Sequence, residues 1–302
     1  IAAVIWANHS LRASITAMRE TLAVIHQEKG LHNVEDKVAS VQEIFTLQGM
    51  EELKEAEAKY TGSNKTVKGI ILAAGQGKEL GNLTEKIPKT LLPLHHNTIL
   101  GSIVEGMNQV NITDITVVRG FQKDMITGDQ FRTVDNPDFN TTQDLYSLYL
   151  AKDNLTDAVM ITYGDNAFRK HVLNSLLESD GDIKIVVDAD PSSTKSHDRV
   201  ICSQPYSNDF FNQDIFVNDI HHSESDAQTH GVWPGILMVE KNKIAVLKEA
   251  LDILSQQPDF KKLSVVDLIQ YLSQKDKVQV VYTKGGWVGV NDLEDFKEAS
   301  QF

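Results

Sequence analysis

The chain changes its hydrophobic pattern near residue 66. Before that point, apolar residues recur at intervals of three and four, the spacing of one stripe along a helix. The first such stripe contains Leu11, Ile15, Met18, Leu22 and Ile25. A similar pattern runs over residues 38–60, and residues 61–66, TGSNKT, are small and polar, as in a linker. We therefore expect a helical leader over residues 1–62 and a separate domain over residues 67–302.

From residue 67 onward, short β-rich apolar runs alternate with helical patterns. The runs predict strands at 67–72, 114–118, 158–163, 183–187, 235–239 and 278–282. The helical patterns cover 99–109, 145–152, 171–178, 242–254 and 265–273. This alternation indicates βαβ units, so we predict an α/β, Rossmann-like fold with a mostly parallel central sheet. Residues 203–229 show no clear period and are interpreted as an inserted hairpin or lid.

Composition and charge narrow the possible partners. With 41% hydrophobic and 24% charged residues, the chain of 302 residues is typical of soluble globular proteins, and its apolar runs are too short for a membrane span. Its 42 acidic and 29 basic residues give a net charge of −13, which opposes non-specific binding to nucleic acid. Cys202 is the single cysteine, which excludes an internal disulfide and favours a reducing, cytoplasmic location.

A glycine-rich turn carries the strongest chemical signal. Residues 68–94 read KGIILAAGQGKELGNLTEKIPKTLLPL, in which an apolar strand runs into Gly75 and Gly77. Such a turn lets backbone N–H groups approach an anion, and we expect positive φ at both glycines. The spacing of a Walker P-loop is absent, and Gly81 comes one residue too late for the dinucleotide fingerprint. A Rossmann oxidoreductase therefore stays as the weaker alternative.

The same stretch, followed by Pro88 and Lys89, resembles the signature LAAGxGxxL…PKxLxPL of the nucleotidyltransferase superfamily. The resemblance implies that Lys89 neutralises phosphate oxygens near the reacting phosphorus; the alternative is a solvated loop lysine. It also implies that the strand end and turn bind the nucleotide through Leu72, Ala73, Ala74, Gly75, Gln76 and Gly77. The family commonly has arginine at the position of Glu79, so we expect Lys78 to supply the missing cation.

Two acidic motifs suggest a site for Mg²⁺. The strand 158–163 runs into Gly164 and Asp165, which matches the GD element of the superfamily and places a carboxylate at the carboxyl end of a strand. Asp165 is the first expected metal ligand, with a helix cap as the alternative. Residues 285–296, GGWVGVNDLEDF, resemble the closing motif of the family, whose aspartate aligns with Asn291. Either Asn291 or the adjacent Asp292 is the second expected ligand.

Further residues are candidates for binding the base or the acceptor. Residues 136–151, NPDFNTTQDLYSLYLA, resemble the family element that opens a helix facing the nucleotide. The candidates in this element are Thr142, Gln143 and Ser147. Gly164, which directly precedes Asp165, is a further expected contact to the nucleotide. Trp233 and Trp287 could present aromatic faces to a cation, although core packing is the common alternative. Arg199 could hold a phosphonate through its guanidinium fork, or form an ordinary ion pair.

The leader also resembles a known family. Residues 5–18, IWANHSLRASITAM, and 33–49, NVEDKVASVQEIFTLQG, resemble the C-terminal end of phosphoenolpyruvate mutase, a (β/α)₈ barrel. Its catalytic groups belong to earlier strands, so no mutase activity is expected. The alternative is an ordinary helical hairpin. The chain starts at Ile1 rather than methionine, which leaves open that it is a fragment, and the apolar stripe makes a homo-oligomer through the leader plausible.

The combined resemblance implies a pathway. Mutase domains fused to nucleotidyltransferases occur in phosphonate biosynthesis, where the second domain transfers CMP from CTP to 2-aminoethylphosphonate or 2-hydroxyethylphosphonate. We therefore expect CTP, Mg²⁺ and a small phosphonate as the ligands. A choline-phosphate or sugar-phosphate nucleotidyltransferase is the rival enzyme. Glu79 and Asn291 motivate the remaining alternative, a nucleotide-binding module that does not catalyse.

Overall fold

The computed structural model describes residues 66–302 except 95, 191–196, 208–213, 224–228 and 301–302. They fall within the compact unit Thr66–Phe302. The predicted leader over residues 1–62, including its mutase-like segments, lies outside the described residues.

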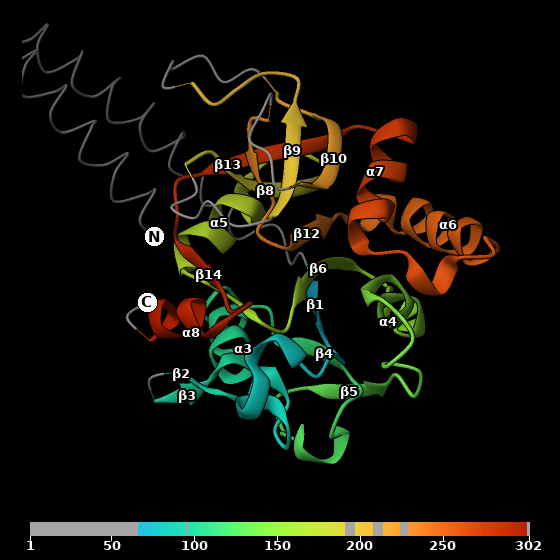
Figure 1. Cartoon of the computed structure of the whole chain (residues 1–302). Helices are drawn as coiled ribbons and strands as arrows, with labels where there is room; N and C mark the ends of the chain where they lie inside the picture. The colour runs from blue at the N-terminus through green and yellow to red at the C-terminus, as the bar shows by residue number, and fades with distance from the viewer. Residues whose placement is uncertain (1–65, 95, 191–196, 208–213, 224–228, 301–302) are drawn as a thin grey trace, which may run out of the picture. The chain divides into compact units, whose positions relative to one another are not determined.

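A ten-stranded sheet forms the centre of the part of the chain that the structure describes (Figure 1). Its order is β10-β9-β11-β8-β12-β6-β1-β4-β5, and β13 pairs with β8. The strands are β1 (Val67–Ala73), β4 (Asp114–Arg119), β5 (Arg132–Asp135), β6 (Ala158–Tyr163), β8 (Ile183–Asp188), β9 (His197–Cys202), β10 (Val217–Ser223), β11 (Gly231–Val232), β12 (Ile236–Val239) and β13 (Val278–Thr283). Two smaller pairs are β2 (Pro93–Leu94) with β3 (Asn97–Thr98), and β7 (Asn166–Phe168) with β14 (Trp287–Gly289).

Most of the central strands run in one direction. Strands β5, β4, β1 and β6 pair in parallel, and so do β8 and β13. Strand β12 is antiparallel to both β6 and β8, so β8 runs in the same direction as β6. Strands β6 and β8 are buried almost throughout, as expected for strands that are covered on both faces. The predicted α/β fold with a mostly parallel sheet is confirmed.

Helices cover both faces of this sheet. They are α3 (Ile99–Gln109), α4 (Asp144–Leu150), α5 (Lys170–Glu178), α6 (Ile244–Ser255), α7 (Val265–Lys275) and α8 (Leu293–Ala299). One hydrophobic cluster contains the buried residues of α4, α6 and α7, and a second contains those of α3 and α5. Local capping fixes where helices begin: the Thr98 hydroxyl accepts the Gly101 N–H at 3.0 Å, and Ser264 forms a capping box with Asp267.

The elements missing from the sequence prediction are short or polar. Strand β5 lies at the sheet edge, and its residues Arg132 and Thr133 are exposed, so it lacks an apolar signal. Part of the predicted hairpin 203–229 is β10, which pairs antiparallel with β9 and extends the main sheet. Within the described residues, no helix combines the length and the apolar character needed to cross a membrane.

Candidate active site

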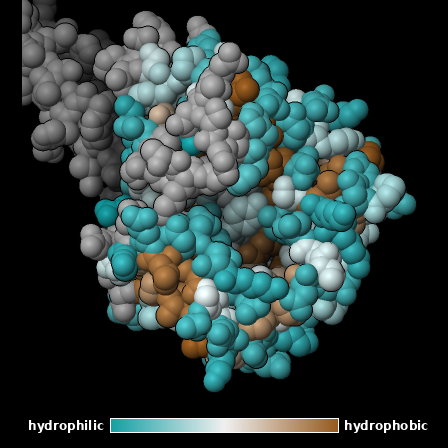
Figure 2. Space-filling view, in the orientation of Figure 1, coloured by the Kyte–Doolittle hydropathy of each residue, from teal (hydrophilic) through white to brown (hydrophobic). Residues whose placement is uncertain are grey.

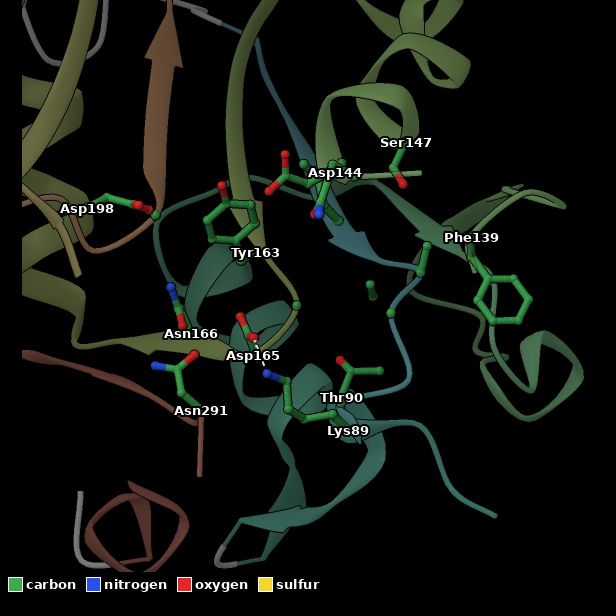
Figure 3. A pocket seen from close by; sticks show the side chains of 18 of the residues that line it. Lys89, Thr90, Phe139, Asp144, Ser147, Tyr163, Asp165, Asn166, Asp198 and Asn291 are labelled. Atoms are coloured by element: carbon green, nitrogen blue, oxygen red, sulfur yellow. Dashed lines mark ion pairs between the residues drawn. The ribbon is translucent and has the colours of Figure 1, made fainter. Parts of the chain in front are cut away.

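A pocket of about 580 Å³ lies where β1 and β6 end. Figure 2 shows a mostly hydrophilic face that is hollowed near its centre, and Figure 3 shows the pocket from close by. The predicted site residues that line it are Leu72, Ala73, Ala74, Gly75, Gly77, Lys89, Thr142, Gln143, Ser147, Gly164, Asp165, Trp233, Trp287 and Asn291. The predicted residues Gln76, Lys78, Arg199 and Asp292 are not among the lining residues.

The glycine turn is tied to the segment that carries Lys89. Gly77 has φ +78°, and a Cβ added there would lie 2.6 Å from the Cβ of Lys89, so the close packing requires glycine. The backbone N–H of Lys89 donates to the Gln76 carbonyl at 3.3 Å, and the Thr84 hydroxyl donates to the Gly77 carbonyl at 2.5 Å. The expectation of positive φ at Gly75 is wrong: Gly77 makes the left-handed turn, and a Cβ on Gly75 would meet nothing within 4 Å.

Lys89 lies between two carboxylates. Its Nζ is 2.7 Å from Oδ2 of Asp165 and 2.6 Å from Oε1 of Glu79, and the side chain is only 12% exposed. Burial lowers the pKa of the Lys89 ammonium, but the Asp165 and Glu79 carboxylates outweigh burial, and the pKa lies above its ordinary value. Lys89 is therefore a permanent cation at neutral pH.

Backbone contacts place Asp165 beside the glycine turn. The Gly164 N–H donates to the Leu72 carbonyl at 2.8 Å, and a Cβ on Gly164 would lie 2.6 Å from the Cβ of Ala73. The Val290 N–H donates to the Asp165 carbonyl at 3.1 Å, which brings the end of β14 next to the end of β6. Asn291 consequently faces the pocket near Asp165 (Figure 3).

The structure separates the two candidates for the second metal ligand. The Asp292 carboxylate accepts the backbone N–H groups of Glu294 and Asp295 at 2.8 and 2.9 Å, so it caps α8. Asn291, in contrast, lines the pocket. Its amide oxygen and the Asp165 carboxylate are hard oxygen donors, the type that Mg²⁺ prefers.

Asp165 and Asn291 provide two oxygen donors, which suits a metal ion whose remaining ligands come from a substrate and water. No group of three or more His, Cys, Asp and Glu side chains assembles as a metal site in the described residues. Mg²⁺ is usually held by one or two carboxylates together with phosphate oxygens and water. The oxygen donors of Asp165 and Asn291 therefore fit Mg²⁺ bound together with a nucleotide.

A second part of the pocket is held together by Asn136. This buried amide donates to the hydroxyls of Thr142 at 3.1 Å and Ser147 at 3.0 Å, which holds together the segment before α4 and the helix itself. Phe139 lies nearby, on the same side of the pocket as Ser147 (Figure 3). The group offers short polar side chains and one aromatic ring.

A third part, across the pocket from Lys89, is acidic and aromatic (Figure 3). It contains Asp144 at the start of α4, Tyr163 at the end of β6 and Asp198 in β9. Burial raises the pKa of Asp144 to about 6, although the Tyr163 hydroxyl and the Val265 N–H hydrogen-bond to its carboxylate. Burial, helped by the nearby Asp144 and Asp198 charges, also raises the pKa of Tyr163 well above its ordinary value, so the phenol stays neutral.

Two tryptophans also line the pocket. The Trp233 ring is 5.6 Å from the Tyr163 ring at an angle of 65°, and its indole N–H donates to the Ile236 carbonyl at 2.9 Å. Trp233 is 4% exposed, so it is part of the core as well as of the pocket lining. The indole N–H of Trp287 donates to Oδ2 of the buried Asp188 at 2.7 Å, which fixes the orientation of that ring.

Three of the predicted residues lie elsewhere for local reasons. Lys78 is exposed, and Glu79 rather than Lys78 lines the pocket after the turn at Gly77. The Gln76 amide donates to the Thr84 carbonyl at 3.2 Å and so holds the turn. Arg199 is 3% exposed within β9; because neighbouring strand residues point to opposite faces and Asp198 faces the pocket, Arg199 faces away from it.

Sequence reasoning did not propose Asp144, Tyr163 or Asp198 as binding residues. Asp144 begins a helix and Tyr163 ends a buried strand, so each has an ordinary structural interpretation. The available signal was positional: Tyr163 directly precedes Gly164 and Asp165, and Asp144 directly follows Thr142 and Gln143.

The comparisons with known proteins identify the class of this domain. Residues 69–205 match the family model of the MobA-like NTP transferase domain, so the chain carries a nucleotidyltransferase domain. The solved structure of CTP:phosphocholine cytidylyltransferase from Streptococcus pneumoniae matches with a TM-score of 0.61 at 21% identity, covering 78% of this chain and 98% of that chain. This similarity shows a shared fold.

Two curated relatives are similar to different parts of the chain. In the N-terminal region, 57 residues are 56% identical to phosphoenolpyruvate phosphomutase from Tetrahymena pyriformis, covering 19% of this chain and 19% of that protein. A stretch of 118 residues is 30% identical to CMP-5'-(3-aminopropyl)phosphonate synthase from Streptomyces rubellomurinus, covering 36% of this chain and 19% of that protein. The chain therefore spans about a fifth of the length of each relative. Both resemblances inferred from the sequence are confirmed.

Proposed function

We propose that residues 67–302 transfer CMP from CTP to a small phosphonate that carries a cationic amine, with release of pyrophosphate and a requirement for Mg²⁺. The observation that carries this proposal is the pairing of two opposed walls in one pocket. Lys89 and Asp165 lie beside the glycine turn, and Asp144, Tyr163 and Asp198 lie across from them (Figure 3). A glycine turn with a lysine suits phosphates, whereas acids beside aromatic rings suit an amine.

In this reaction the protein positions the two substrates and forms no covalent bond with either of them. A phosphonate oxygen of the acceptor attacks the α-phosphorus of CTP, a new P–O bond forms, and the bond to the oxygen bridging to the β-phosphorus breaks. Pyrophosphate leaves with the electron pair of that bond. The attacking oxygen is already anionic, so no general base is required, and catalysis rests on orientation and charge stabilisation.

Lys89 and Asp165 have complementary roles in this scheme. The Lys89 ammonium neutralises phosphate oxygens whose charge grows during transfer. Asp165 and Asn291 would hold Mg²⁺, which when bound neutralises further phosphate oxygens. The turn residues Leu72 to Gly77 would bind the triphosphate through backbone N–H groups. The hydroxyls of Thr142 and Ser147, held by Asn136, would contact the base or the ribose.

Two kinds of support favour an aminophosphonate. The relatives that the chain resembles include a phosphomutase and a CMP-aminopropylphosphonate synthase, by their names. Independently, two carboxylates in the wall opposite Lys89, those of Asp144 and Asp198, would attract an ammonium group by charge, whereas a hydroxyl would offer them only a hydrogen bond. We therefore place 2-aminoethylphosphonate ahead of 2-hydroxyethylphosphonate.

Phosphocholine is a second candidate acceptor. Its quaternary ammonium group would suit the aromatic faces of Tyr163, Trp233 and Trp287, all of which line the pocket. A cytidylyltransferase for phosphocholine also shares the fold.

The test is pyrophosphate release with the four ribonucleoside triphosphates against a panel of acceptors. The panel contains 2-aminoethylphosphonate, 2-hydroxyethylphosphonate, phosphocholine and glucose 1-phosphate. The proposal predicts turnover with CTP and 2-aminoethylphosphonate. Turnover with glucose 1-phosphate alone would make the domain a sugar-phosphate nucleotidyltransferase. Calorimetric binding of CTP without pyrophosphate release for any acceptor would make it a binding module.

A further inference from the structure

The Glu79 carboxylate forms an ion pair with Lys89, the ammonium group that we propose binds the triphosphate. Its Oε1 lies 2.6 Å from the Lys89 Nζ, which also contacts Asp165 at 2.7 Å, and the Glu79 side chain is 45% exposed. Glu79 lies two residues after Gly77, in the first turn of the short helix Lys78–Thr84, and lines the pocket. An incoming triphosphate that pairs with Lys89 therefore competes with the Glu79 carboxylate for this ammonium group.

The charges that line the pocket determine which form of the triphosphate can compete with Glu79. Two carboxylates surround one ammonium group, and Lys89 is the single lysine or arginine among the described residues that line the pocket. The lining also contains four acids, Glu79, Asp144, Asp165 and Asp198. A free triphosphate, which is highly anionic, would meet net repulsion here, whereas a triphosphate that carries a divalent cation would not.

We infer that Glu79 is a counter-charge that holds Lys89 until a metal-bound triphosphate displaces it, so that the pocket selects the metal complex of the nucleotide over free nucleotide. This inference rests on the proposed function. Glu79 is a positioning residue in this scheme, because it acts through Lys89 rather than on the reacting atoms. Its exposure allows it to turn into solvent, and exposed ion pairs are weak enough to be exchanged for a better partner.

The test measures CTP binding by calorimetry in the absence of acceptor, in EDTA and in Mg²⁺, at constant ionic strength. The wild-type chain is expected to bind CTP much more tightly in Mg²⁺ than in EDTA. The Glu79→Gln variant removes one negative charge next to the phosphates and should bind CTP about tenfold more tightly in EDTA. In Mg²⁺ its affinity should change by less than about threefold, so the metal dependence shrinks.

Glu85→Gln is the matched control. Glu85 is an exposed acid at the end of the same short helix and does not line the pocket, so its removal tests for a general charge effect. We expect this variant to bind CTP as the wild type does in both buffers. The thermal unfolding midpoints of both variants should match that of the wild type, which checks that the fold is retained.

The outcomes separate this inference from the proposed function. Unchanged affinity of Glu79→Gln in EDTA, or weaker binding of this variant in Mg²⁺, would overturn the role of Glu79 while leaving a CTP-binding domain in place. An equal gain for Glu85→Gln would also overturn it, because the effect would then be one of overall charge. Absence of CTP binding to the wild type in both buffers would overturn the proposed function, and the inference with it.

Discussion

The two walls of the pocket are built in different ways. The wall around Lys89, called the phosphate wall below, joins two segments. The glycine turn and Lys89 form one short stretch tied together by backbone hydrogen bonds, and Asp165 is added by the end of the neighbouring strand β6. The acidic wall contains no such backbone-linked stretch, because its side chains come separately from α4, β6 and β9. In the proposed function, phosphate binding therefore rests mainly on backbone geometry at the turn, whereas acceptor choice rests on side chains that the fold brings together.

The largest expected effect falls on the phosphate wall. Replacing Lys89 or Asp165 by alanine should lower the turnover number by roughly 10² to 10⁴. The first change removes a positive charge that stabilises the transition state, and the second removes the carboxylate proposed to hold Mg²⁺. Pyrophosphate release under saturating substrates measures this effect, and circular dichroism checks that the fold is retained. Turnover within a few-fold of wild type for both variants would show that this wall is not the catalytic centre.

The next effect tests the acidic wall. Asp198→Asn should raise the KM for 2-aminoethylphosphonate about tenfold, because the ammonium group loses a nearby negative charge. The KM for 2-hydroxyethylphosphonate and the KM for CTP should stay as in the wild type. Asp219→Asn is the control, because Asp219 lies on β10 outside the pocket and pairs with His221. A parallel rise for both acceptors would contradict recognition of the amine.

Asp144 links the acidic wall to stability. Its folded-state pKa of about 6 lies above the ordinary value of 3.8, so ionised Asp144 destabilises the fold, and the cost grows as the pH rises from about 4 to about 6. Asp144→Asn should therefore raise the melting temperature by a few degrees at pH 7.5, roughly 2–4 °C for each kcal/mol gained. The difference from wild type should vanish near pH 3.5. Scanning calorimetry at both pH values measures it, and a lower melting temperature at pH 7.5 would contradict the assignment.

The smallest effect concerns the support of the glycine turn. Thr84→Val removes the hydrogen bond from the Thr84 hydroxyl to the Gly77 carbonyl with little change in volume. Such a bond contributes about 1 kcal/mol, so the KM for CTP should rise by up to about fivefold. The KM for the acceptor should remain the same, and a change confined to the acceptor would contradict the division between the walls.

The same contrast explains what could be predicted from the sequence. The glycine turn and Lys89 were recognisable because their spacing along the chain is itself the motif. Asp165 was recognisable because it follows glycine directly after an apolar run that predicted a strand. Asp144 and Asp198 could not be recognised as one wall, because only the folded chain brings α4, β6 and β9 to the same pocket. The sequence did not show which of the neighbours Asp198 and Arg199 lines the pocket; they lie on opposite faces of β9, and Asp198 is the lining residue.

The choice between Asn291 and Asp292 needed atomic geometry. The sequence left both open, and the structure shows the Asp292 carboxylate capping α8 while Asn291 lines the pocket. Likewise, the arginine commonly found in the family at the position of Glu79 led us to expect Lys78 as its replacement. The left-handed turn at Gly77 instead presents Glu79 to Lys89.

A crystal structure of the chain with CTP, Mg²⁺ and 2-aminoethylphosphonate tests the central claim most directly. We predict the triphosphate between the glycine turn and Lys89, the metal on Asp165, and the amine against Asp144 and Asp198. Nucleotide density away from the turn, or an acceptor whose amine points out of the pocket, would contradict the account.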